Sequence, residues 1–152
     1  MPLKIRLKPR EKFAINGAVL TAGDQGATLL LYNRASLLRG KDIMQEEEAT
    51  SPVKRLYFFI MLMLLDSANR DKYYVSYMKY LTDLISAISL REVKESLIVI
   101  HDYVAAGESY QALKLCRALI AVETALLTGT TPPEFPKELK KHFPVTDTEQ
   151  TP

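Results

Sequence analysis

Basic and aliphatic residues alternate along residues 3–8, LKIRLK, and this pattern is typical of a β-strand. Successive side chains of a strand point to opposite faces of a sheet, so one face here is cationic and the other apolar. Similar short runs follow, separated by turn signals such as Asn16-Gly17, a pair that supplies the positive φ angles of a type I′ hairpin turn. The predicted strands form a small, curled antiparallel meander over residues 3–8, 12–16, 18–21, 27–32 and 35–38.

After residue 51 the hydrophobic period changes to three and four residues, which predicts helices. Ser51 and Pro52 make a strong helix start, because the serine can cap free amides and a proline at the first helical position loses no hydrogen bond. Ser89 and Glu92 have the spacing of a capping box, and Gly107 is a suitable left-handed residue at a helix end. The predicted helices span residues 52–65, 68–88, 90–106 and 109–127.

These elements divide the 152 residues into four parts. The fold class predicted is α+β, in which a small N-terminal antiparallel β module precedes a C-terminal bundle of three to four helices. The apolar run over residues 56–65 is about half of the roughly 20 residues that a membrane-spanning helix requires, so it predicts a buried core helix. The parts are a basic β module (1–44), an acidic linker (45–51), a helical bundle (52–127) and a Pro- and Thr-rich mobile tail (128–152).

Charge is distributed unevenly between these parts. Residues 1–44 contain eight Lys or Arg and three Asp or Glu, a net charge of +5, whereas the whole chain carries +2 and the remainder therefore −3. Such asymmetry indicates that a part that binds a polyanion is joined to a part with another task. The candidate residues for binding a polyanion are the eight cations of the β module: Lys4, Arg6, Lys8, Arg10, Lys12, Arg34, Arg39 and Lys41.

The alternative for any one of these cations is an ordinary solvated surface charge. Five positive charges fall within residues 4–12, however, and only Glu11 opposes them, which favours nucleic acid. If four to six cations contact phosphates, the logarithm of the binding constant should fall against the logarithm of the salt concentration with a slope of roughly −3 to −5.

The sequence offers little that could carry catalysis or hold a cofactor. The spacings of phosphate-binding loops, zinc hydrolases and serine hydrolases are absent, and His101 and His142 lie far apart. Cys116 has no identifiable base, so we interpret it as a buried hydrophobe. Four tyrosines between residues 73 and 80 could stack on bases, but their helical spacing favours core packing. We therefore predict no enzyme, no metal and no cofactor, and a single cysteine fits a cytoplasmic location.

The chain resembles the FlbT family, the flagellin post-transcriptional regulators of alphaproteobacteria. The matching stretches are MPLKIRLKPREKFAINGAVL, ASLLRGKDIMQEEEATSPVKRLYFFIMLMLLD and AAGESYQALKLCRALI, which reach from Met1 to about Glu123. The resemblance implies a cytoplasmic, non-enzymatic protein without a membrane segment. It would bind the 5′ untranslated region of flagellin mRNA, control its translation and decay, and repress flagellin synthesis.

The N-terminal part is also similar to the small β-rich carbon storage regulators of the CsrA type. In that family the first strand and an arginine after the last strand form the RNA-contacting edge of an interleaved dimer. The resemblance implies a homodimer, with residues 5–8 as the first strand and Arg39 as that arginine. This chain departs from the family by an insertion near Gly40 and by Leu38 where the family has a histidine.

Two hypotheses of function follow. The first is an RNA-binding translational regulator whose RNA contacts all lie before residue 45, while the acidic helical part stands outside that contact and receives a protein signal or dimerises. The second is a protein-binding adaptor or chaperone of flagellar assembly, which would hold flagellin through helical surfaces after residue 52. The apolar run at residues 56–65 would serve the second hypothesis.

Overall fold

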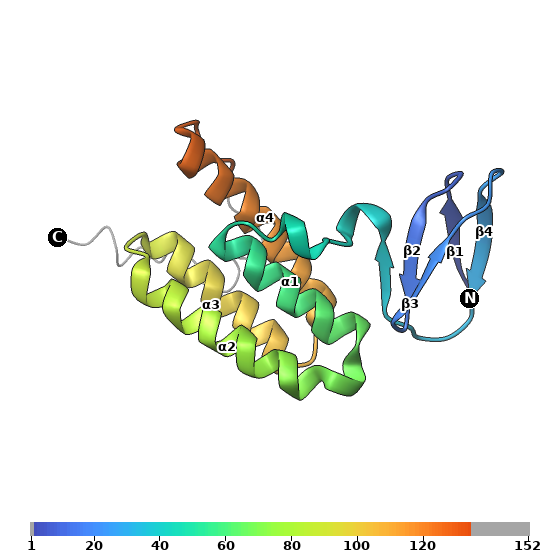
Figure 1. The fold of residues 1–152 in the computed structure, drawn as a ribbon, viewed down its shortest axis with the longest axis horizontal. Helices are drawn as coiled ribbons and strands as arrows, with labels where there is room; N and C mark the ends of the chain where they lie inside the picture. Colours follow the sequence, from blue (N-terminus) through green and yellow to red (C-terminus); the bar gives the residue numbers. More distant parts are fainter. Residues whose placement is uncertain (1, 135–152) are drawn as a thin grey trace, which may run out of the picture.

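The computed structural model describes residues 2–134, which form a β module beside a helical bundle (Figure 1). The strands are β1 (Leu3–Leu7), β2 (Lys12–Ile15), β3 (Ala18–Thr21), β4 (Ala27–Leu31) and β5 (Leu37–Arg39). The helices are α1 (Pro52–Leu65), α2 (Arg70–Ala87), α3 (Arg91–Ala105) and α4 (Ser109–Thr128). The predicted α+β fold class is confirmed. Most of the predicted tail, residues 135–152, lies outside the described residues.

The strands do not form the predicted meander. β1 pairs antiparallel with β4, and β2 lies between β3 and β5, so the five strands make two small sheets. The β2–β3 hairpin has the predicted turn, with Asn16 and Gly17 at φ angles of 49° and 87°. Two sheets form because each can then cover the apolar face of the other. The buried side chains of their shared core are Ile5, Leu7, Phe13 and Ala22.

Helix α1 lies at the centre of the bundle, where it packs against α2 and α4, and α3 packs against α4. The predicted core helix is confirmed, because Leu56 and Ile60 are 0% exposed and Tyr57 is 3% exposed. The expected core role of the tyrosines on α2 is confirmed as well. Tyr77 is fully buried, and its three neighbours pack against the same core.

The ends of the helices match the sequence signals in part. Ser51 caps α1 by accepting a hydrogen bond from the Lys54 amide at 3.4 Å, as predicted. The predicted capping box at Ser89 is wrong, because α3 begins one residue later than the box requires and Leu90 occupies the N-cap position. A capping box is found instead in the acidic linker, at the short 3₁₀ turn Glu46–Glu48. There the backbone amide of Gln45 donates to the side-chain carboxylate of Glu48.

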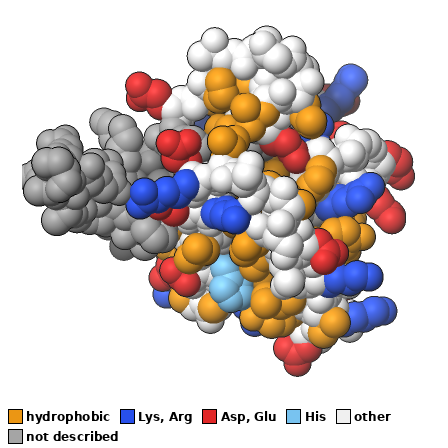
Figure 2. Space-filling model, turned by 90° about the vertical axis from the view of Figure 1, so that its left-hand side faces the viewer, with side chains coloured by type: hydrophobic (Ala, Val, Ile, Leu, Met, Phe, Trp, Pro, Cys, Tyr) orange, Lys and Arg blue, Asp and Glu red, His pale blue; other side chains and the backbone are white. Residues whose placement is uncertain are grey.

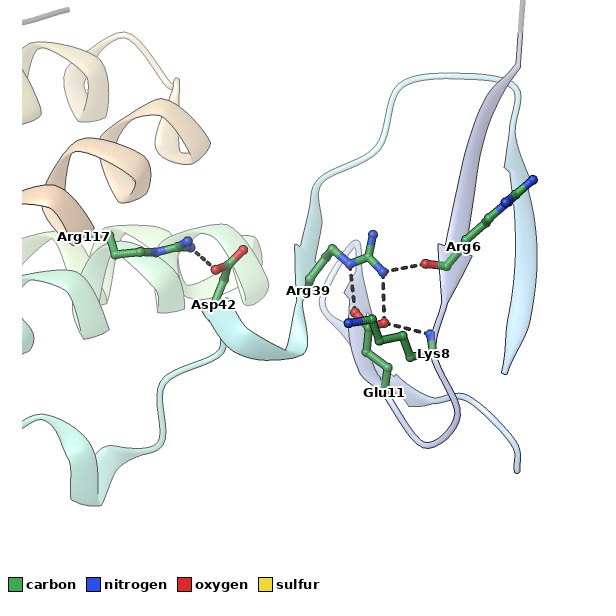
Figure 3. Close-up of polar contacts among 6 residues, drawn as sticks. All are labelled: Arg6, Lys8, Glu11, Arg39, Asp42 and Arg117. Carbon is green, nitrogen blue, oxygen red and sulfur yellow. Dashed lines mark hydrogen bonds and ion pairs between the residues drawn. The ribbon is translucent and has the colours of Figure 1, made fainter. Parts of the chain in front are cut away.

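Arg39, at the end of β5, clamps the two sheets together (Figure 3). Its Nε and Nη2 atoms donate to the two carboxylate oxygens of Glu11 at 2.8 and 2.9 Å. Nη2 also donates to the backbone carbonyl of Arg6 on β1 at 2.5 Å. Such bidentate, charge-assisted bonds are stronger than neutral ones. The clamp therefore holds the β1–β4 sheet against the sheet of β2, β3 and β5.

Asp42, three residues after Arg39 in the sequence, anchors the β module to the bundle. Its side chain is 7% exposed and forms an ion pair with Arg117 of α4 (Figure 3). The Tyr57 hydroxyl of α1 donates to the backbone carbonyl of Asp42 at 2.6 Å. Since a buried carboxylate is costly unless it is paired, this contact favours one placement of the module.

A second contact between the module and the bundle lies at the tip of the β2–β3 hairpin. Gly17 has a φ of +87°, and a Cβ atom there would overlap the carbonyl oxygen of Leu65 at the end of α1. A glycine is required for both reasons, because side chains rarely adopt this φ and the two backbones approach closely.

Gly17→Ala should therefore destabilise the protein by about 1–3 kcal/mol, because alanine is strained at this φ and also displaces the hairpin from α1. Thermal unfolding followed by circular dichroism should show a melting temperature lower by roughly 3–10 °C.

Two other glycines provide matched controls. Gly107 has a similar φ of +79° but open space around it, so Gly107→Ala carries the strain without the overlap. Gly23 has open space and no positive φ, so Gly23→Ala should melt like the wild type. If Gly17→Ala loses no more stability than Gly107→Ala, the hairpin does not dock on α1 as described.

The clamp also predicts an acid-sensitive β module. Hydrogen bonds from Arg39, and then from the Lys8 amide, lower the pKa of Glu11 from 4.5 to about 2. Because the folded pKa lies below the unfolded one, the stabilisation is complete above pH 4.5 and is lost as the pH falls toward 2. A carbon-detected NMR titration of the Glu11 carboxyl should give a midpoint near 2 in the wild type and closer to 4.5 in Arg39→Gln. A wild-type midpoint near 4.5 would contradict the clamp.

Candidate nucleic-acid interface

The outer face of the β1–β4 sheet presents the basic residues of β1. Ile5 and Leu7 point into the core between the sheets, so Lys4 and Arg6 point to solvent. Lys4 lies opposite Leu30 of β4 and Arg6 opposite Thr28, and all four side chains are exposed. The Arg6 side chain points away from Arg39 (Figure 3). The alternating pattern of the sequence therefore forms an exposed cationic row.

Three predicted cations lie together at the turn between β1 and β2. Lys8, Arg10 and Lys12 are exposed, and Arg10 has a left-handed backbone with a φ of 62°. Arg10 forms an ion pair with Asp24 at 3.2 Å, but both side chains are more than 80% exposed. Exposed pairs of this kind contribute about 0–1 kcal/mol, so Arg10 stays available to another anion.

The other five predicted cations line a groove between the β module and the turn that joins α3 to α4. The groove has a volume of about 1770 Å³. One wall is formed by β1 and by the segment 34–42, and the other by residues 103–117. The predicted residues at this groove are Lys4, Arg6, Arg34, Arg39 and Lys41.

Sequence analysis missed the helical side of this groove. Tyr110, Lys114 and Arg117 of α4 line it, together with Tyr103 near the end of α3. The first three recur at positions i, i+4 and i+7, which places them on one face of the helix. That spacing was a usable signal in the sequence, but the sequence analysis treated only the β module as the cationic surface.

The end of the bundle remote from the β module has a different character. Figure 2 shows basic and acidic side chains interspersed there, with hydrophobic side chains between them. A surface of mixed charge does not attract a polyanion strongly. The β module and the groove beside it are therefore the better candidate for contact with nucleic acid.

Neither a metal site nor a reactive nucleophile is found among the described residues as an alternative to the basic surface. Residues 2–134 contain no group of three or more His, Cys, Asp or Glu side chains that could hold a metal ion. Cys116 is fully buried, and this burial raises the pKa of its thiol, which disfavours the nucleophilic thiolate. Within the same residues, every helix is too short or too polar to cross a membrane.

Comparison with known proteins gives the family. A family model described as "Flagellar protein FlbT" matches residues 3–127. No solved structure matches the chain. Among the curated relatives, a probable flagellum biosynthesis repressor protein FlbT of Caulobacter sp. (strain K31) is 47% identical over 123 residues, covering 81% of this chain and 94% of the relative.

Two further relatives support the same assignment. The flagellum biosynthesis repressor protein FlbT of Caulobacter vibrioides (strain ATCC 19089 / CIP 103742 / CB 15) is 43% identical over 123 residues, covering 81% of this chain and 87% of the relative. A probable flagellum biosynthesis repressor protein FlbT of Rhodopseudomonas palustris (strain TIE-1) is 36% identical over 129 residues, covering 84% of this chain and 99% of the relative. The chain therefore belongs to the FlbT family of flagellar proteins.

Proposed function

We propose that this protein is a cytoplasmic post-transcriptional repressor of flagellin synthesis, which binds the 5′ untranslated region of flagellin mRNA and controls its translation and decay. Family membership supports a flagellar role, since the relatives carry the name of flagellum biosynthesis repressors. The observation that carries RNA binding is the exposed cationic row of Lys4 and Arg6 on β1. The neighbouring cations of the β1–β2 turn extend it.

The β module can act on the message through phosphates and exposed base edges. Lys4, Arg6 and Lys8 are exposed cations on or next to one short strand, and single-stranded loops are the usual targets of sequence-specific RNA recognition. Arg39 has a second task, because Glu11 and the Arg6 carbonyl already engage two of its three guanidinium nitrogens. It positions β1 and contacts RNA only with its remaining donors. A message held near its ribosome-binding site is less accessible to the ribosome.

The structure gives less support to the adaptor or chaperone hypothesis. The apolar run that would hold a client protein, residues 56–65, lies in the centre of the bundle. Half of its side chains are buried and the others pack partly buried against the same core. No broad apolar face of this segment is therefore open to flagellin.

The proposed RNA-binding form is a homodimer. β3 and β4 each have one strand neighbour among the described residues, so each presents an open edge. Large apolar side chains are also exposed on the β module, and such features favour pairing with another chain. The exposed side chains are Leu3, Val19, Leu20, Leu30 and Tyr32.

Light scattering of the purified chain should therefore give twice the chain mass of 17.2 kDa. Leu20→Lys on β3 and Leu30→Lys on β4 should shift this mass toward the monomer, because a charge disfavours an apolar contact between copies. A monomeric wild type at all protein concentrations would contradict the dimer as the RNA-binding form.

RNA binding is tested by titration of a labelled flagellin leader RNA with the full chain at two salt concentrations. The double variant Lys4→Ala/Arg6→Ala should bind about tenfold or more weakly, since charge-assisted contacts are lost. Its salt slope should be flatter by about 2.

Lys79→Ala is the matched control, because Lys79 is an exposed lysine on α2 that does not line the groove. Circular dichroism checks that every variant is folded. An unchanged affinity and salt slope in the double variant would contradict the proposed role of β1.

A further inference from the structure

The groove between the β module and the α3–α4 turn carries an excess of positive charge from both parts. Its lining includes seven Lys or Arg and two acidic residues, Asp42 and Glu108. Arg39 and Arg117 are held in ion pairs with carboxylates. The other five have no ion pair within residues 2–134: Arg34, Lys41 and Lys114, and, with side chains on the outer face of β1, Lys4 and Arg6.

Two aromatic rings lie on the helical wall of the same groove. Tyr110, in the first turn of α4, is 53% exposed, and Tyr103 near the end of α3 is half-buried. Lys114 lies one helical turn after Tyr110 and is exposed. Sites for single-stranded nucleic acids combine cations that follow the backbone with aromatic faces on which bases stack. The two kinds of side chain are placed together here.

The size of the groove favours a polymer over a small molecule. Small-molecule sites usually enclose roughly 300–1,000 Å³ and are mostly apolar. This groove is larger, at about 1770 Å³, and it is rich in charge. An acidic protein segment would satisfy the charge but would not use an exposed tyrosine beside it as a stacking surface. The charge and the rings together favour single-stranded RNA.

We propose that a single-stranded RNA segment lies in this groove, with its phosphates on Lys114, Arg34 and Lys41 and one base stacked on Tyr110. The inference rests on the proposed function and extends it, because it makes the helical bundle part of the RNA site. Arg117, held by Asp42, adds positive potential on the same wall. This RNA site on the helical wall replaces the expectation that the helices stand outside the RNA contact.

A consequence is that one RNA segment touches two parts of the chain. The β module supplies Arg34 and Lys41, and α4 supplies Tyr110 and Lys114. Binding therefore depends on the relative placement of the module and the bundle, which Asp42 and Gly17 determine. A partner that changed this placement would change RNA affinity without touching the RNA.

The test uses the full chain and the labelled flagellin leader RNA, with affinity measured at two salt concentrations. Tyr110→Ala should weaken binding about 5- to 100-fold, because a stacked base is lost, and Tyr110→Phe should keep most of the affinity. Lys114→Ala should weaken binding and flatten the salt slope by about 1. Both side chains are exposed and have no ion pair in the described residues, so their loss should leave the melting temperature unchanged.

Lys79→Ala on α2 is again the matched lysine control. If Lys4→Ala/Arg6→Ala weakens binding but Tyr110→Ala and Lys114→Ala do not, the groove proposal is overturned and the proposed function stands. If the wild type does not bind the leader RNA, both are overturned. If an acidic protein fragment displaces the RNA and its own binding is insensitive to Tyr110→Ala, the groove is a protein site instead.

Discussion

The ion pair between Asp42 and Arg117 is the contact on which the arrangement of this protein depends. Asp42 follows the last strand by three residues, and its carboxylate is almost fully buried against α4. Arg117 itself is about half exposed, so its role is to compensate the buried carboxylate, which would be left without a partner if Arg117 were removed. Together with the close approach of Gly17 to the end of α1, the ion pair holds the β module in one position on the bundle.

The same network separates cations that hold the structure from cations that are free for a ligand. Arg39 is engaged by Glu11 and Arg117 by Asp42, so each contributes mainly to the placement of the strand or helix that carries it. The other lysines and arginines that line the groove have no ion pair in the described residues. The net charge of +5 in residues 1–44 therefore overstates the charge that is free to bind RNA, and α4 restores part of it.

Local features of the fold could be predicted from the sequence because they depend on neighbouring residues. The helices follow from three- and four-residue periodicity, and the Asn16-Gly17 turn follows from the backbone freedom of those two residues. The pairing of β1 with β4 could not be predicted, because it depends on how two apolar sheet faces cover each other in space. Ser89 was misassigned because the first turn of α3 begins one residue later than its capping signal indicated.

The candidate site could be predicted on one side only. Charge density along the chain identified the cations of the β module, since they lie close together in sequence. Lys114 and Tyr110 lie about seventy residues away from that segment and reach the groove only because Asp42 docks on α4. A contact of this kind leaves no local pattern in the sequence.

The most direct measurement is ultraviolet crosslinking of the wild-type chain to a flagellin leader RNA, followed by mass spectrometry of the crosslinked peptides. Crosslinks should occur in both parts of the chain: in residues 3–12 and 34–41 of the β module, and in residues 103–117 of the bundle. Crosslinks restricted to α2 would contradict RNA binding by the β module and the groove. So would the absence of crosslinks under conditions in which a control RNA-binding protein is crosslinked to the same RNA.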